Sequence, residues 1–210
     1  MIKLEKLNKF QKEAVTHMAG PCLVVAGAGS GKTKVLTTRI AYLVDNDIKD
    51  YNILAITFTN KAAKEMKERV DNLIGKNNSF IGTFHSFGLK IIRENALLLG
   101  FTSSLTILDS DDTLSVIKKI LKDKNLDSKV MAPSYIKNRI SFIKNENLSL
   151  SEVNTFFNTP IEKKVVEIYK EYENIIHRNN SLDFDDLLVL PVKLFKENNE
   201  ILNKYQEKYR

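Results

Sequence analysis

Apolar residues follow two different periods along this chain of 210 residues, and the change of period divides the chain in two. In the first hundred residues, short continuous apolar runs alternate with longer segments in which apolar residues recur every three or four positions. The short runs predict buried parallel strands at 23–26, 53–58 and 80–84. Strands that alternate with amphipathic helices are typical of an α/β fold, so we expect a doubly wound parallel sheet in this part of the chain.

The helices of this first part have recognisable ends and faces. Asn8 is a suitable N-cap for a short helix that reaches residue 15, and Gly75 is a suitable C-terminal stop for the helix after the second strand. A further helix should cover residues 85–100. The helix behind the first strand buries one face, formed by Val35, Leu36, Ile40, Leu43 and Val44.

From about residue 110 to residue 181 the strand pattern is absent and only helical patterns remain. Three apolar stripes predict three amphipathic helices. They contain Leu114, Ile117, Ile120 and Leu121; Ile136, Ile140 and Ile143; and Val165, Tyr169, Tyr172 and Ile176. We therefore expect an all-helical subdomain inserted into the α/β fold. The Asp-rich segment 182–188 then starts a last amphipathic helix, because aspartates favour the positive end of a helix.

A glycine-rich segment, AGAGSGKT at residues 26–33, follows the first predicted strand and precedes a helix. It matches the phosphate-binding pattern GxxxxGK[ST], except that Ala26 replaces the first glycine. Glycines let backbone N–H groups approach phosphates, Lys32 can reach the β- and γ-phosphates, and the Thr33 hydroxyl can ligate Mg²⁺. This order of strand, loop and helix predicts a site for a nucleoside triphosphate and Mg²⁺.

Gln11 lies in the short helix upstream of this loop, and its amide offers a donor and an acceptor side by side, which suits the edge of adenine. A glutamine on an amphipathic helix is more often simply solvated. Together with the loop it completes the residues that we predict to bind ATP, with Lys32 also acting in catalysis. These residues are Gln11, Ala26, Gly27, Ala28, Gly29, Ser30, Gly31, Lys32, Thr33 and Lys34.

Hydrolysis also requires an acidic residue at the end of another strand, which holds Mg²⁺ and orients the attacking water. No apolar run in the sequence ends in Asp-Glu. The nearest one, Leu105–Asp109, is followed by Ser110 and fits a helix start better. We therefore expect nucleotide binding without turnover, an incomplete sheet that favours self-association, and a chain that is the N-terminal piece of a longer protein.

Aromatic and polar residues follow the second and third predicted strands, at the edge where ligands of such sheets bind. These residues are Phe58, Thr59, Asn60 and Lys61 after one strand, and Thr83, Phe84 and His85 after the next. Aromatic rings stack on bases and polar side chains hold phosphates, so we predict contacts with single-stranded DNA. The alternative is that Phe58 and Phe84 belong to the core and that His85 caps a helix.

The net charge of +6 is modest for a nucleic-acid-binding protein, but the basic residues are concentrated locally. From Phe58 to Arg93 there are seven Lys or Arg residues and three acids, and from Lys118 to Lys144 there are eight and two. Lys137, Arg139 and Lys144 lie off the apolar stripe, so we expect them to contact duplex phosphates at a junction with the single strand. An ordinary solvated face is an equally good interpretation of these charges.

Composition excludes several other classes of protein. No apolar run approaches the roughly 20 residues of a membrane span, and the N-terminus lacks the apolar stretch of a signal peptide, so we expect a cytoplasmic protein without membrane contacts. One cysteine cannot form an internal disulfide, and with three histidines it makes no spaced zinc set. We expect Cys22 to be a small buried hydrophobe at the start of the first strand.

Taken in order, these motifs resemble the N-terminal part of the UvrD/Rep family of superfamily 1 DNA helicases. Residues 8–11 (NKFQ) resemble the family's adenine-reading Q motif, residues 26–33 its motif I, in which Ala at the first position is normal, and residues 57–63 (TFTNKAA) its motif Ia. Residues 82–86 (GTFHS) resemble motif Ib, and residues 182–188 (LDFDDLL) the segment where the chain re-enters the first RecA-like domain. The resemblance covers essentially the whole chain.

This resemblance implies an incomplete RecA-like P-loop domain 1A, made of residues 1–108 and 183–210, with a helical domain 1B at 109–182 inserted into it. It also implies a parent protein that is an ATP-dependent 3′ to 5′ DNA helicase of repair or replication, whose missing C-terminal part carries the acidic residues and a second motor domain. Two alternatives remain open. One is a non-catalytic, nucleotide-gated DNA-binding module, and the other is a small P-loop kinase, although the basic insertion lacks the arginine density of a kinase lid.

Overall fold

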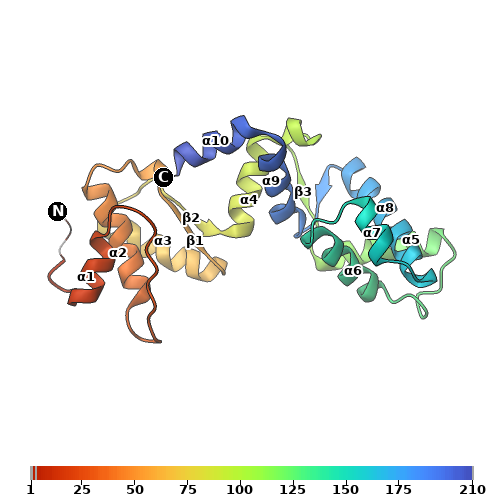
Figure 1. Cartoon of the computed structure of the whole chain (residues 1–210), viewed down its shortest axis with the longest axis horizontal. Coiled ribbons are helices and arrows are strands. Elements are labelled where there is room, and N and C mark those ends of the chain that lie inside the picture. Colours follow the sequence, from red (N-terminus) through yellow and green to blue (C-terminus); the bar gives the residue numbers. More distant parts are fainter. Residues whose placement is uncertain (1, 3, 210) are drawn as a thin grey trace. The chain divides into compact units, whose positions relative to one another are not determined.

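The computed structural model describes residues 2 and 4–209, with the backbone alone at residue 150, and consists mainly of helices with two short parallel sheets (Figure 1). The strands are β1 (Leu54–Thr57), β2 (Phe80–Thr83), β3 (Thr106–Ile107) and β4 (Ser181–Leu182). The helices are α1 (Lys9–Thr16), α2 (Lys32–Asp45), α3 (Asn60–Ile74), α4 (Phe84–Glu94), α5 (Ser110–Asp123), α6 (Pro133–Asn145), α7 (Leu150–Phe156), α8 (Pro160–Arg178), α9 (Asp186–Glu197) and α10 (Asn199–Lys208), with 3₁₀ turns η1 (Asp50–Asn52) and η2 (Ala96–Leu99). Within the residues described, every helix is too short or too polar to cross a membrane.

The contacts divide the chain into two compact units: residues 1–84 with 200–210 form the first, and residues 85–199 form the second. The first unit is built around β1 and β2, which pair in parallel from Leu54 opposite Phe80 to Thr57 opposite Thr83. Helix α3 packs against both strands and against α2. The core of this unit consists of Ile40, Ile53, Met66 and Val70. The second and third strands predicted from the sequence are therefore confirmed, and so is their parallel direction.

The first predicted strand, at residues 23–26, is wrong. The segment has no regular secondary structure, and Leu23 and Val25 are 90% and 89% exposed. A continuous apolar run shows that a segment is suited to burial, but a strand forms only when a neighbour accepts and donates its backbone hydrogen bonds. None of the backbone-to-backbone bonds in the described residues reaches residues 22–26. Cys22 is exposed for the same reason, so its expected burial is also wrong.

The second unit contains the helical stripes that the sequence predicts. Helices α5, α6 and α8 pack against one another. Their buried core contains Ile117, Ile120, Leu121, Ile136, Ile140, Ile143, Val165, Tyr172 and Ile176, with Tyr169 partly buried against it. The three predicted stripes are thus confirmed except at Leu114, which is half-buried and lies outside this core. The two-residue strands β3 and β4 pair in parallel at the edge of this bundle, so the region from 109 to 182 is not helical throughout.

Helices α4 and α9 also belong to the second unit, because they pack closely on each other. A Cβ atom placed on Gly88 of α4 would lie 1.8 Å from the carbonyl oxygen of Leu187 in α9. Helix α4 ends at Glu94 rather than at Gly100, and η2 follows it. The contacts therefore divide the chain at residues 84 and 199, whereas the domain boundaries inferred from the resemblance fall at 108 and 182 and stay a prediction.

Candidate nucleotide and nucleic-acid sites

The glycine-rich loop has the backbone conformation that its glycines permit. Gly29 and Gly31 have φ angles of 74° and 84°, in the left-handed region that side chains with a Cβ rarely adopt. Gly31 is the N-cap of α2, so the loop leads directly into the positive end of that helix. Lys32 curls back over the loop, and its Nζ donates to the carbonyl oxygens of Ala26 at 3.1 Å and Gly27 at 2.7 Å. The loop therefore presents backbone donors and one ammonium group at a helix N-terminus, which is the chemistry of a phosphate site.

Gln11 lies beside this loop although it is 19 residues away in sequence. Its Oε1 accepts the backbone N–H of Asn8 at 3.1 Å, which completes a capping box at the start of α1. Its Nε2 donates to the carbonyl oxygen of Ser30 at 2.9 Å. The structure thus brings Gln11 and the loop together, as the prediction of one nucleotide site requires. Its contact with adenine stays a prediction.

A cavity of about 270 Å³ lies between α1, the exposed segment 24–26 and the start of α2. Its walls are mainly apolar, and the lining includes Phe10, Gln11, Val24, Ala26, Lys32 and Val35. Thr33 is half-buried in the first turn of α2. Lys34 donates from its Nζ to the carbonyl oxygen of Lys6 at 2.8 Å, so its ammonium group is bound to the N-terminal segment. The nucleotide contact of Lys34 stays a prediction.

Phe58 and Phe84 form an exposed aromatic pair in the first unit. Their ring centroids are 6.3 Å apart, and Phe58 is 93% exposed. The alternative that Phe58 belongs to the core is wrong, because its ring lies outside the protein. Asn60 and Lys61 are exposed in the first turn of α3, at the positive end of that helix, which favours an anion.

Thr59 and Thr83, the two hydroxyl residues at these strand ends, are engaged within the protein itself. Thr59 is the N-cap of α3 and accepts the N–H of Ala62 at 3.1 Å. Thr83 is buried at the end of β2. A structural role accounts for both positions, and DNA contacts by Thr59 and Thr83 stay predictions.

A second aromatic pair lies in the second unit, where His85 meets Phe184 with ring centroids 5.3 Å apart. Helix α4 begins at Phe84, so His85 lies inside its first turn and is not its N-cap. Phe184 is 55% exposed and precedes α9. From sequence, residues 182–188 are predicted to start a helix and, by resemblance, to lead the chain back into the first RecA-like domain; neither prediction assigns a role to this ring. The sequence does contain a signal for this ring: an aromatic residue lies between aspartates at a helix start, where capping the helix does not require an aromatic side chain.

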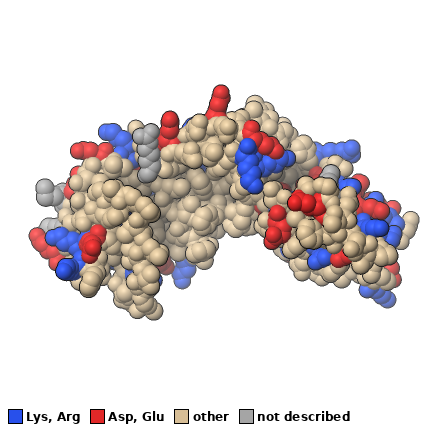
Figure 2. Space-filling model, in the orientation of Figure 1, with Lys and Arg blue, Asp and Glu red and all other residues tan. Residues whose placement is uncertain are grey.

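Two of the three basic residues predicted to touch duplex DNA already bind other side chains. Lys137 donates from Nζ to the hydroxyl of Ser110. Arg139 pairs with Glu162 at 2.9 Å, and its guanidinium lies over the ring of Phe157. Figure 2 shows basic and acidic residues interspersed on the face it draws, which is typical of a solvated surface. On that face the basic residues do not form one continuous patch.

Lys144, the third of these residues, is 4% exposed, so the expectation that it lies on an open face is wrong. Being off the apolar stripe of α6 makes a residue exposed only where no other element covers that side of the helix. Here Glu173 of α8, Asp183, and Asp186 at the start of α9 cover that side of α6 with carboxylates. Lys144 is therefore not available to duplex phosphates in this structure.

Residues 7–210 match the family described as UvrD/REP helicase N-terminal domain. The chain belongs to this family. It is 46% identical over 210 residues to the ATP-dependent DNA helicase PcrA of Staphylococcus epidermidis, and 45% identical to PcrA of Staphylococcus aureus. The alignment with each covers 99% of this chain and 29% of the relative. The chain thus spans less than a third of the length of these curated relatives and is a fragment of a UvrD-like helicase.

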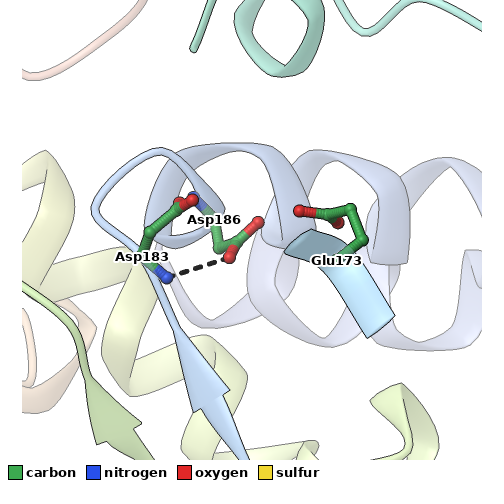
Figure 3. A group of neighbouring side chains, drawn as sticks. All are labelled: Glu173, Asp183 and Asp186. Atoms are coloured by element: carbon green, nitrogen blue, oxygen red, sulfur yellow. Dashed lines mark hydrogen bonds between the residues drawn. The ribbon is translucent and has the colours of Figure 1, made fainter. Parts of the chain in front are cut away.

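In this UvrD/REP chain, Lys144 lies among three carboxylates that Figure 3 shows together: Glu173 of α8, Asp183 of the turn before α9, and Asp186, the first residue of α9. Its Nζ is 2.8 Å from an oxygen of each of Glu173, Asp183 and Asp186. Among the described residues, these three acids form the one group spaced to hold a metal ion. The lysine ammonium already occupies the place of the cation, so this cluster is not a metal site.

The charges of this cluster strongly affect its pKa values. Burial, together with the nearby carboxylates of Asp183 and Glu173, raises the pKa of Asp186 to about 7, although Lys144 lowers it. The pKa of Asp183 is lowered, because Lys144 and several hydrogen bonds outweigh the effect of burial. The pKa of Lys144 lies well above its usual range, since three carboxylates outweigh burial. The ammonium group of Lys144 thus contacts three carboxyl groups, and one of them, that of Asp186, has a pKa near neutral pH.

Proposed function

We propose that this chain is the N-terminal part of an ATP-dependent DNA helicase that moves 3′ to 5′ along single-stranded DNA and unwinds duplexes in repair or replication. The observation that carries the proposal is the loop at residues 26–33, with Lys32 at the N-terminus of α2 and Gln11 hydrogen-bonded to the loop. Membership of the UvrD/REP family and the helicase names of the relatives support it. A cytoplasmic location follows from this function.

In the proposed nucleotide site, Lys32 exchanges its bonds to two loop carbonyls for bonds to the β- and γ-phosphates. The backbone N–H groups between Gly27 and Thr33 bind the remaining phosphate oxygens, and Gln11 reads the adenine edge. The Thr33 hydroxyl at the first turn of α2 is a suitable oxygen ligand for Mg²⁺, which neutralises phosphate charge when it is bound. The apolar cavity beside Phe10 and Gln11 offers space for the base.

The proposed DNA contacts are the exposed rings, which stack on bases, and the polar residues beside them. In the first unit these are Phe58, Phe84, Asn60 and Lys61, and in the second unit His85, with Lys137 and Arg139 as candidates for a single-strand to duplex junction. An aromatic ring of this kind binds every base, which suits a protein that moves along DNA of any sequence.

No apolar run in the sequence ends in Asp-Glu, so we propose that the chain alone binds ATP weakly and does not turn it over. Its domain 1A is residues 1–108 with 183–210, and its domain 1B is residues 109–182. The exposed apolar segment 22–26 lacks a pairing strand, which favours association between copies. The acidic residues that hydrolysis requires belong to the C-terminal part of the same protein. A nucleotide-gated DNA-binding module is the second candidate, because such a module binds nucleotide without hydrolysing it and therefore needs no strand that ends in Asp-Glu.

The test is the affinity of the chain for a fluorescent ATP analogue in the presence of Mg²⁺. Lys32→Ala should abolish measurable binding and leave the circular dichroism spectrum unchanged, because an exposed ammonium contributes to phosphate binding and little to the fold. Lys49→Ala, which removes an exposed lysine from a loop, is the matched control and should bind normally. Equal affinity of the Lys32→Ala protein and the wild type would disprove the nucleotide site. Nucleotide-dependent DNA affinity without an Asp-Glu strand in the longer sequence would favour the second candidate.

A further inference from the structure

The turn at residues 183–186, which we call the aspartate turn, is closed by its own side chains. The backbone N–H of Asp183 donates to Asp186 Oδ2, and the N–H of Asp186 donates to Asp183 Oδ1, each at 3.0 Å. Figure 3 shows Asp183 and Asp186 facing each other across this turn, with Glu173 approaching from α8. Both aspartates are buried, so each bond lies in an environment where water does not compete with it.

Three further side chains hold the aspartate turn from other helices. Lys144 Nζ donates to Asp183 Oδ2 and Asp186 Oδ1 at 2.8 Å each, and the hydroxyl of Tyr172 donates to Asp183 Oδ2 at 2.9 Å. Asn145 donates from Nδ2 to Asp185 Oδ1 at 2.8 Å. The turn is therefore fixed from α6 and α8 at three of its four residues.

The side chains of the three aspartates in the turn accept hydrogen bonds, whereas that of Phe184 makes none. Phe184 is also 55% exposed. It lies between two buried anchor residues, so its backbone has little freedom to move. Its ring also meets His85 at 5.3 Å. An exposed aromatic ring on a fixed backbone loses little conformational freedom when it stacks on a base, and this raises affinity.

We propose that Lys144 is a positioning residue for nucleic-acid binding: it fixes the aspartate turn so that Phe184, beside His85, presents a preorganised ring to a single-stranded base. This inference rests on the proposed single-stranded DNA contacts of the chain. Without the ammonium group, the carboxylates of Glu173, Asp183 and Asp186 repel one another, and the turn keeps only the bond from Asn145 of the three that join it to α6.

The experiment measures the affinity of the 210-residue chain for a single-stranded oligonucleotide that contains 2-aminopurine, whose fluorescence is quenched when it stacks on a ring. Phe184→Ala should weaken binding about 5- to 150-fold and reduce the quenching, as expected for one stacked base. Lys144→Met should also weaken binding and reduce the quenching. In the Phe184→Ala background, Lys144→Met should cause no further loss, because both changes act through one ring.

Two other variants separate positioning from loss of charge. Lys144→Arg keeps the cation and its donors and should restore part of the binding and quenching. Lys170→Met removes an exposed lysine from α8 of the same unit and should bind as the wild type does. If Lys144→Met does not fold, Tyr172→Phe removes only one hydroxyl bond to the turn, and should give a smaller loss that again disappears in the Phe184→Ala background.

The outcomes distinguish this inference from the function on which it rests. Wild-type binding by both Phe184→Ala and Phe58→Ala would overturn the proposed DNA contacts. Weak binding by Phe184→Ala together with normal binding by folded Lys144→Met, or by Tyr172→Phe where that variant replaces it, would overturn the positioning role alone. Losses that multiply independently in the double variant would also overturn it.

Discussion

The buried cluster around Lys144 predicts that the second unit is more stable in mild acid than in mild base. The perturbation is a change of pH from 5 to 8. Asp186 has a pKa of about 7 in the folded protein and the ordinary value of 3.8 when the chain is unfolded. Between these two values the folded protein binds a proton that the unfolded chain does not hold, so the free energy of unfolding falls as the pH rises.

The magnitude follows from this difference in pKa. Each pH unit between about 4 and 7 removes about 1.4 kcal/mol, so the step from pH 5 to pH 8 removes about 3 kcal/mol, and nearly all of it is lost by pH 7.5. The carboxyls whose pKa is lowered, those of Asp45, Glu152, Glu162 and Asp183, contribute stability that is complete above their ordinary values and is lost only at lower pH. Their effect therefore lies outside the window from pH 5 to 8.

The assay is urea unfolding followed by circular dichroism at pH 5, 6, 7 and 8, with the variant Asp186→Asn as the control. The variant removes the titrating group, so its unfolding free energy should change less with pH than that of the wild type by about 3 kcal/mol across the window. Its absolute stability differs for other reasons, and only the slope decides. A wild type whose stability rises from pH 5 to pH 8, or a variant with the same slope, would refute the reasoning.

Four further predictions concern single side chains. Phe58→Ala should weaken single-stranded DNA binding by about 1–3 kcal/mol in a titration by fluorescence anisotropy. Because the ring is exposed, the variant should unfold at the same urea concentration as the wild type, and a loss of fold would instead support the interpretation that Phe58 belongs to the core. Lys61→Ala should reduce the slope of log affinity against log salt concentration by about one, and an unchanged slope would remove it from the phosphate contacts. Gly88→Ala should destabilise the chain by about 1–3 kcal/mol in urea unfolding, because its Cβ would overlap the carbonyl oxygen of Leu187, and unchanged stability would contradict the close packing of α4 on α9. Lys137→Glu should weaken binding to a single-strand to duplex junction more than binding to a single strand, and equal losses would argue against a duplex contact.

The local features of this chain could be predicted from sequence because each depends on neighbouring residues. The apolar stripes of α5, α6 and α8 follow from helical periodicity, and the structure buries them as expected. The strands β1 and β2 also lie where continuous apolar runs predict them. The order of motifs along the chain was sufficient for the family, which the match over residues 7–210 confirms.

Tertiary structure alone decided which of these segments is covered and by what. The run at 23–26 has the composition of a strand but stays exposed, because none of the described residues offers it a backbone partner. Lys144 has the position of a surface lysine but is buried, because its partners Asp183 and Asp186 lie 39 and 42 residues further along the chain. Periodicity shows which side of a segment is apolar, whereas pairing and burial depend on residues far away in sequence, and only folding brings those together.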